Sequence, residues 1–143
     1  MQRCCDVPIA HIPFIWPHIE GFVAKTLAYD ECGRYWPADI FDLLLAGRSR
    51  LWTAYDSDRH AFDGFAVTDI IIWPRMTECR VWMIGGRHLR LWQDEMREML
   101  EAFARDNGCS AITGSGRKGW TKMPGYLIKG VIIEKALSDG REK

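Results

Sequence analysis

The chain has 143 residues, of which 48% are apolar, and this is enough to bury the core of one domain without metal or disulfide support. Its 19 Lys and Arg residues balance its 19 Asp and Glu residues, so it lacks the basic charge of a general nucleic-acid-binding protein. No apolar run approaches the ~20 residues that span a bilayer, and Pro8 and Pro13 interrupt the N-terminal stretch before it reaches signal-peptide length. We therefore expect a single domain over residues 1–143 that binds neither nucleic acid nor membrane.

The five cysteines and four histidines show no spacing typical of a metal site. The cysteine count is odd and no paired motif is present, which favours reduced, buried thiols in a cytosolic protein. We expect no metal.

The N-terminal residues carry the weakest structural signal. Residues 7–15 have some strand character, but Pro8 and Pro13 each remove a backbone donor from any sheet. Residues 1–16 are therefore expected to form an edge strand at best, or to be weakly ordered.

Two helices are predicted next. Pro17 suits a first helical turn, and an apolar stripe follows at three- and four-residue steps until Gly33. Pro37 opens a second, shorter helix whose end is marked by Gly47.

The central part of the chain predicts a sheet. Residues 49–56, 64–73 and 79–85 alternate or are rich in β-branched and aromatic side chains, which predicts an antiparallel meander of three strands. An amphipathic helix over residues 91–105 then leads to a short buried strand over 109–113. Because a helix connects the last two strands, they should be parallel neighbours joined in the right-handed sense.

The last part of the chain begins with a polar glycine loop over 114–119. A short helix from Trp120 and a strand over 126–134 are predicted after it. The charged tail from residue 138 should be frayed.

This succession of elements over residues 17–135 resembles the GNAT N-acetyltransferase superfamily, an α/β fold with a mixed central sheet flanked by helices. The local matches are Leu51-Trp52-Thr53-Ala54, Gly64-Phe65-Ala66-Val67, Ala104-Arg105-Asp106-Asn107-Gly108-Cys109, and Gly125-Tyr126 at the position of the family's frequent Gly-Phe. The phrase Gly116-Arg117-Lys118-Gly119-Trp120 with Pro124-Gly125-Tyr126 is also similar to a GNAT-like group encoded by tailed phages and prophages.

The resemblance implies acetyl-CoA as cofactor, with its pyrophosphate held by a glycine-rich loop at the start of the long helix. Here Leu91 and Gln93 fall where the family has glycines, with Trp92 between them, and bulky side chains oppose close approach of a phosphate. Gly85-Gly86-Arg87-His88 lies just upstream. It is either a displaced phosphate loop or an ordinary flexible turn between strand and helix.

The resemblance also implies a general acid and a general base. The family's acid is often a tyrosine, and the matching position here is Thr121, whose hydroxyl has a pKa too high to protonate a thiolate usefully. The candidate base is Asp69, on the same face of its strand as Phe65 and Val67. Asp69 is either a solvated residue or a perturbed carboxylate in a cleft.

Two further features remain as possible functional signals. Arg87, Arg117 and Lys118 follow the carboxyl ends of strands predicted to be parallel, so they form an anion site or lie on ordinary solvated loops. The seven tryptophans are many for this length; most should be core, and one or two exposed ones would anchor an interface. A protein partner or a homo-oligomer is expected.

The favoured hypothesis is a phage- or prophage-encoded accessory or virion-associated protein that uses the scaffold for interaction. Its acetyl-CoA site is expected to be degenerate, so no cofactor is expected and acetyl transfer is lost. The alternative is an acyl-CoA-dependent N-acetyltransferase with a divergent phosphate loop at residues 85–88. The resemblance implies a location in the bacterial cytoplasm or within a phage particle.

Overall fold

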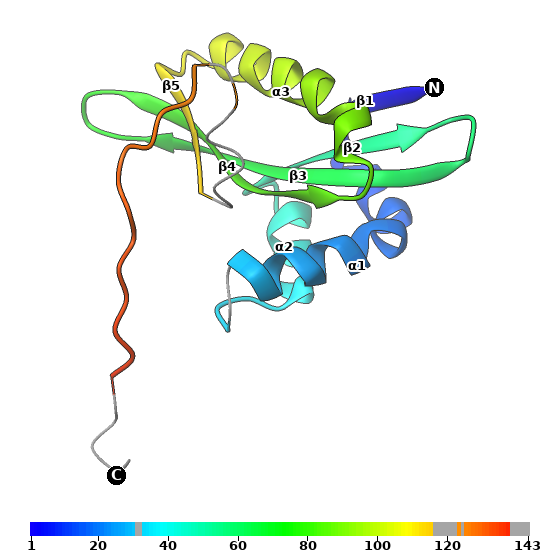
Figure 1. Cartoon of the computed structure of the whole chain (residues 1–143), viewed down its shortest axis with the longest axis horizontal. Coiled ribbons are helices and arrows are strands. Elements are labelled where there is room, and N and C mark those ends of the chain that lie inside the picture. Colours follow the sequence, from blue (N-terminus) through cyan, green and yellow to red (C-terminus); the bar gives the residue numbers. More distant parts are fainter. Residues whose placement is uncertain (31–32, 116–122, 124, 138–143) are drawn as a thin grey trace.

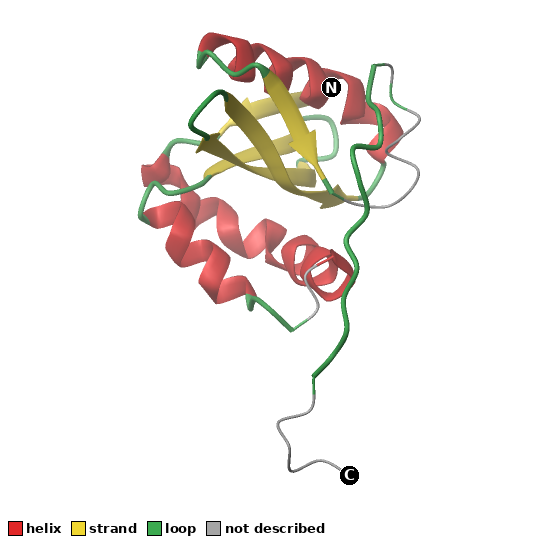
Figure 2. Ribbon diagram, turned by 90° about the vertical axis from the view of Figure 1, so that its left-hand side faces the viewer, coloured by secondary structure: helices red, strands yellow, loops and turns green. Residues whose placement is uncertain are grey.

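A computed structural model describes residues 1–30, 33–115, 123 and 125–137. Five strands form one sheet in the order β1-β2-β3-β4-β5. The helix α3 covers one face of this sheet, and α1 and α2 cover the other (Figures 1 and 2). The strands and helices are β1 Gln2–Asp6, a 3-10 turn Ile9–His11, α1 Ile12–Asp30, α2 Pro37–Leu45, β2 Arg50–Asp56, β3 Ala61–Ile72, β4 Thr77–Gly86, α3 Leu89–Asp106 and β5 Ala111–Gly114.

The first four strands are antiparallel neighbours, and β4 pairs with β5 in parallel. This confirms the predicted meander and the predicted parallel crossover through α3. The strand β5 begins two residues later than the expected residue 109 and is half-buried rather than fully buried. The sheet is mixed and flanked by helices, as the sequence indicated.

The two faces of the sheet carry separate core clusters. Successive side chains of β2 belong to different clusters. Leu51 faces α1 and α2, whereas Trp52 and Ala54 face α3. The larger cluster is completed by α1 and α2, and the smaller by the stripe on α3 that consists of Trp92, Met96, Leu100 and Ala104. Leu91, at the start of the predicted amphipathic helix, is exposed, because the buried side chains recur at four-residue steps from Trp92.

The N-terminal region corrects the sequence prediction. Residues 7–15 are not a strand; the edge strand is β1, and α1 already begins at Ile12. Pro13 lies in the first turn, where the missing N–H has no intrahelical partner, whereas Pro17 lies inside the helix. The helix continues past Pro17 because the following apolar residues bury one face against the sheet; these are Ile19, Val23 and Leu27.

The C-terminal part also differs from the prediction. Residues 126–134 do not form a strand: the chain from Tyr126 to Leu137 is extended and pairs with no strand of the described residues. A strand requires a second backbone for its hydrogen bonds, and the apolar sequence alone does not provide one. The short helix expected from Trp120 and the tail from residue 138 fall outside the described residues.

Candidate functional site

The most distinctive backbone geometry lies where β4 and β5 part. The parallel pairing runs only from Glu78↔Ala111 to Val81↔Gly114, while β4 continues to Gly86. At the same point the pairing of β4 with β3 skips Trp82, so β4 has a β-bulge there. Trp82 and its neighbour Met83 both pack into the cluster on the α1 and α2 face. The first half of β4 is therefore paired on both sides. Its second half is paired only with β3 among the described residues and forms an edge of the sheet.

The N-terminus of α3 lies just beyond this edge. His88 precedes the helix with left-handed backbone angles, no side chain caps the first turn, and that turn contains no acidic residue. His88, Arg90 and Leu91 are exposed there. Backbone N–H groups at an uncapped helix start, together with the helix dipole, favour an anion.

Trp92 does not obstruct this helix start. Its side chain is fully buried in the cluster between α3 and the sheet, and its indole Nε1 donates to the carbonyl oxygen of Arg87 at 2.9 Å. The sequence suggested that Trp92 would obstruct a phosphate at this helix start, but its ring lies in the core cluster between α3 and the sheet. Leu91 is the bulky side chain that remains exposed, with 60% of its surface accessible.

Close packing explains Gly85 and Gly86 without a ligand. A Cβ on Gly85 would lie 2.4 Å from Oγ1 of Thr26 in α1. Gly86 has φ +137, and a Cβ there would lie 2.2 Å from the carbonyl oxygen of Asp63. These glycines therefore let β4 approach α1 and the β3 backbone.

Asp63 is the carboxylate that the sequence analysis missed. It occupies a bulge of β3, where the pairing with β2 skips it, and its side chain is completely buried. Its oxygens accept hydrogen bonds from Gln2 Nε2 at 2.6 Å, Arg87 Nε at 3.1 Å and Arg59 Nη2. Burial alone would raise the pKa of Asp63, but these donors outweigh it and hold the pKa below its usual range. No local pattern marks Asp63, because its partners come from three different segments.

This arrangement gives Arg87 a structural partner. Its Nε binds Asp63, and its backbone N–H donates to the carbonyl oxygen of Asp63 at 2.7 Å. About half of the Arg87 side chain is still exposed. Arg87 thus fixes the turn between β4 and α3. Arg90, in the first turn of α3, has no hydrogen-bond or ion-pair partner among the described residues.

Asp69, the candidate base, is tied to its neighbours. One carboxylate oxygen accepts from the Ser49 hydroxyl, and the other is ion-paired with Arg80 on the adjacent strand β4. The guanidinium of Arg80 also lies 5.1 Å from the ring centre of Trp82. Asp69 therefore links β3 to β4 and to Ser49, the residue before β2, and both of its oxygens already accept hydrogen bonds.

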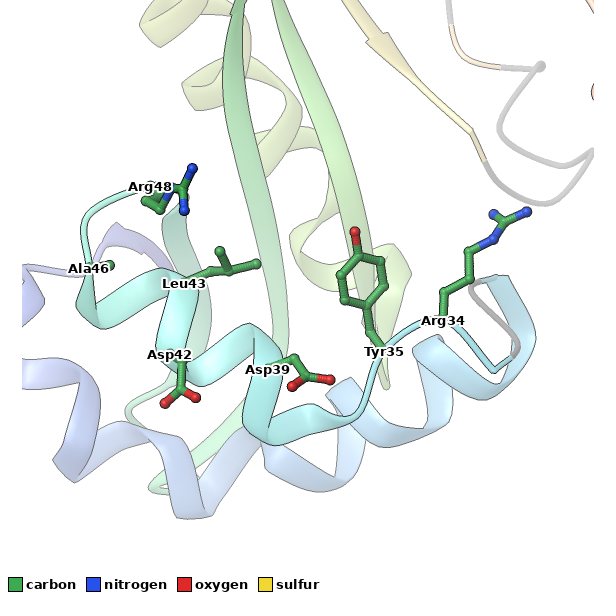
Figure 3. A pocket seen from close by; sticks show the side chains of 7 residues that line it. All are labelled: Arg34, Tyr35, Asp39, Asp42, Leu43, Ala46 and Arg48. Atoms are coloured by element: carbon green, nitrogen blue, oxygen red, sulfur yellow. The ribbon is translucent and has the colours of Figure 1, made fainter.

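An open groove of about 540 Å³ lies on the α2 side of the molecule (Figure 3). It is lined by Arg34, Tyr35, Asp39, Asp42, Leu43, Ala46 and Arg48. The Tyr35 ring packs edge-on against Trp82, with 4.9 Å between ring centres. The groove is thus connected through one aromatic contact to the bulge of β4.

Other predicted site residues have different outcomes. Thr121, Arg117 and Lys118 fall outside the described residues. Tyr126 donates its phenolic hydrogen bond to Glu101 of α3 at 2.7 Å, and burial followed by this contact raises its pKa. Among the described residues, no group of His, Cys, Asp and Glu could hold a metal ion. None of the described helices combines the length and apolar character needed to cross a bilayer.

The sequence matches no protein-family model and no curated protein. Solved structures do match. One is the ribosomal-protein-alanine N-acetyltransferase of Brucella melitensis biovar Abortus 2308, which is 11% identical with a TM-score of 0.69 over 96% of this chain and 100% of that one. Another is a GNAT family acetyltransferase of Staphylococcus aureus subsp. aureus USA300_TCH1516, 13% identical with a TM-score of 0.67 over 95% and 98%.

A third is an aminoglycoside acetyltransferase from an uncultured soil metagenomic sample, solved in complex with sisomicin. It is 9% identical, with a TM-score of 0.69 over 96% of this chain and 97% of that one.

The chain has the GNAT acetyltransferase fold. The likeness extends over nearly the whole length of both chains, which confirms the fold that the sequence suggested. At these identities the comparison concerns the fold alone. The GNAT-like domain differs from the sequence prediction mainly at its two ends.

Proposed function

We propose that this protein is an N-acetyltransferase-like protein that binds acetyl-CoA, with the phosphate end of the cofactor at the N-terminus of α3. The observation that carries the proposal is the uncapped start of α3, with exposed His88 and Arg90 and no acidic residue in its first turn. It lies next to the half of β4 that β5 leaves unpaired. Backbone N–H groups and basic side chains converge there, as an anion requires.

The acceptor substrate would enter from the opposite side. The groove beside α2 meets β4 through the contact between Tyr35 and Trp82, and Asp39 and Asp42 line it. Arg34 and Arg48 line the same groove, so its two positive and two negative side chains suit an acceptor that carries both kinds of polar group. In this proposal Asp69 holds the strands at the bulge instead of removing a proton, since both its oxygens are engaged.

Thermal unfolding with and without acetyl-CoA tests the proposal. At about 100 times the dissociation constant, binding adds ~2.7 kcal/mol of stability. For a domain of this size that raises the midpoint by at least ~5 °C. The substitution Arg90→Glu should abolish the shift, because it places a negative charge at the helix start. The matched control is Arg75→Glu, in the exposed turn between β3 and β4, which should retain the shift.

Gly86 is unsuitable for this test. Its substitution would disturb the β3 backbone, so a lost shift would not separate binding from folding. Absence of any shift in the wild-type protein, or an equal loss in both arginine variants, would contradict the proposal.

A second candidate is an accessory interaction module without acetyl transfer, and in a phage context a virion-associated one. Two observations favour it: the engaged carboxylate of Asp69 and the exposed apolar segment after Tyr126. The phage or prophage origin rests on the sequence phrase over 116–126 alone. The acetyl-CoA titration decides between the two candidates, because the module predicts no saturable shift at any concentration.

A further inference from the structure

The segment that follows Tyr126 has the longest run of exposed large apolar side chains among the described residues. Its apolar side chains are 69% to 90% exposed; they are Leu127, Ile128, Val131, Ile132, Ile133 and Leu137. Figure 1 shows this stretch leaving the sheet as an extended chain, and Figure 2 shows it running past the side of the domain. A soluble domain rarely exposes so many large apolar side chains in one stretch.

Neither face of the segment is packed. Val131, Ile132 and Ile133 are consecutive, so in an extended chain they point alternately to both faces, and all three are exposed. From residue 127 onward, the backbone forms no hydrogen bond to the rest of the described chain. Apolar residues on both faces are typical of a strand inside a sheet, and an unpaired strand offers its backbone to another chain.

The segment is held at two points. At its start, Tyr126 is bonded to Glu101 on α3. Further along, Glu134 lies 3.7 Å from Arg34, in the connection between α1 and α2, where both side chains are exposed. These contacts join opposite layers of the domain, so the residues between them are presented in extended form along its side.

The sequence of the segment is nearly symmetric about Gly130. In an antiparallel pair of identical strands centred on that glycine, Ile128 would lie opposite Ile132 of the second copy, and Leu127 opposite Ile133. Lys129 would lie opposite Val131, so one face would be apolar and the other would carry two lysines beside its apolar pairs. The formal net charge of zero adds no repulsion between two copies.

We propose that residues 127–133 of two copies of this chain pair as antiparallel strands about a twofold axis at Gly130, forming a homodimer. The pairing gives hydrogen-bond partners to one edge of each exposed backbone and brings apolar side chains of the two copies into cross-strand contact on each face. It is independent of acetyl-CoA binding, since none of these residues lies at the start of α3.

Sedimentation velocity over a range of protein concentrations tests the dimer. The substitution Ile132→Asp should weaken dimerisation at least ~100-fold, because apolar burial is lost and a charge is introduced in both copies. The matched control is Ile72→Asp at the end of β3, because the exposed fractions of the two isoleucines are nearly equal, 81% for Ile132 and 80% for Ile72. The control should dimerise as the wild-type protein does. Unchanged melting of dilute Ile132→Asp confirms that the variant is folded.

A cross-link tests the register. A Cβ on Gly130 would have no neighbouring heavy atom within 4 Å, and the φ of Gly130 is not positive, so a cysteine is accommodated there. In the proposed pair the two Gly130 positions face each other at about 4.5–5.5 Å between Cα atoms, which suits a disulfide. Gly130→Cys in a Cys5→Ser background should form a covalent dimer on mild oxidation, whereas the background alone should not.

Several results would overturn the proposal. A wild-type monomer at all concentrations would do so, and it would point to a different protein as the partner. A dimer lost in Ile72→Asp but retained in Ile132→Asp would place the interface at the end of β3. A dimer whose Gly130→Cys variant does not cross-link would exclude this register.

Discussion

Gly64 of β3 and Trp92 of α3 share one space: a Cβ on Gly64 would lie 2.1 Å from Cζ2 of Trp92 and within 2.7 Å of two further ring atoms. The ring is fully buried and its Nε1 is bonded to Arg87, so it cannot move aside without losing that bond. Because Gly64 has no side chain, the Trp92 ring can occupy this space in the core.

The first prediction follows from this contact. Gly64→Ala should destabilise the protein by ~1–3 kcal/mol or more, because the added methyl overpacks a filled site. The matched control is Gly21→Ala in α1, where a Cβ would have no neighbour within 4 Å. That change should leave stability equal or raise it by ~0.5–1 kcal/mol, since alanine favours a helix over glycine. Urea unfolding measures both, and equal midpoints for the two variants would refute the packing account.

The second prediction concerns acid stability. The pKa of Asp63 is lowered in the folded protein, so its contribution is present above the unfolded value of about 3.9 and is lost as the pH falls below it. Asp63→Asn should lose roughly 1.5–3 kcal/mol at pH 7, as for one charged hydrogen bond, and should unfold with a shallower dependence on pH below about 4. Melting midpoints from pH 7 to pH 2 provide the readout. Asp94→Asn on the exposed side of α3 should follow the wild-type curve.

The third prediction separates two costs at Gly86. Gly33 has φ +77 and open space around it, so Gly33→Ala reports the cost of a left-handed alanine alone, roughly 1–2 kcal/mol. Gly86→Ala should cost clearly more, because φ +137 lies outside the left-handed region that alanine can enter and because its Cβ also meets the carbonyl oxygen of Asp63. If chemical denaturation gives the same loss for both, the turn between β4 and α3 relaxes freely and the packing explanation of Gly86 fails.

The fourth prediction tests whether Asp69 and Arg80 act as one unit. Asp69→Asn and Arg80→Met should each destabilise, and the double variant should lose less than the sum, with a coupling of about 0.5–3 kcal/mol. The exposed pair Asp6 and Arg50 is the comparison and should couple by no more than ~1 kcal/mol. Additive losses at Asp69 and Arg80 would leave Asp69 available for another role.

Periodic patterns predicted the central elements correctly because the information is local. The spacing along α3 and the alternation along β2 each lie within one segment, and both are confirmed by the core clusters. The edge strand expected within residues 1–16 is present, but it was placed at residues 7–15 because the sequence of β1, Gln-Arg-Cys-Cys-Asp, has no apolar alternation. It is a strand through its pairing with β2. The strand predicted over residues 126–134 is absent for the opposite reason. Its composition suits a strand, but no other strand of the described residues pairs with it.

The candidate site was harder to predict than the fold. The orientation of Trp92 depends on Gly64, a residue of another element, and the roles of Arg87 and Gly86 depend on Asp63.

The number of tryptophans predicted their burial correctly. Of those in the described residues, Trp16, Trp52, Trp82 and Trp92 are buried and Trp36 and Trp73 are exposed, as expected, while Trp120 falls outside.

The parting of β4 and β5 has a consequence for the exchange of amide hydrogens with solvent. Amides of β4 that point toward β3 should exchange slowly along the strand, apart from the bulge at Trp82, because they donate within the sheet. Amides on the opposite side should be slow only as far as Val81, where the pairing with β5 stops. From there to Gly86, slow and fast amides should alternate along a single strand, so a deuterium-labelling profile would locate the end of the parallel ladder to the residue.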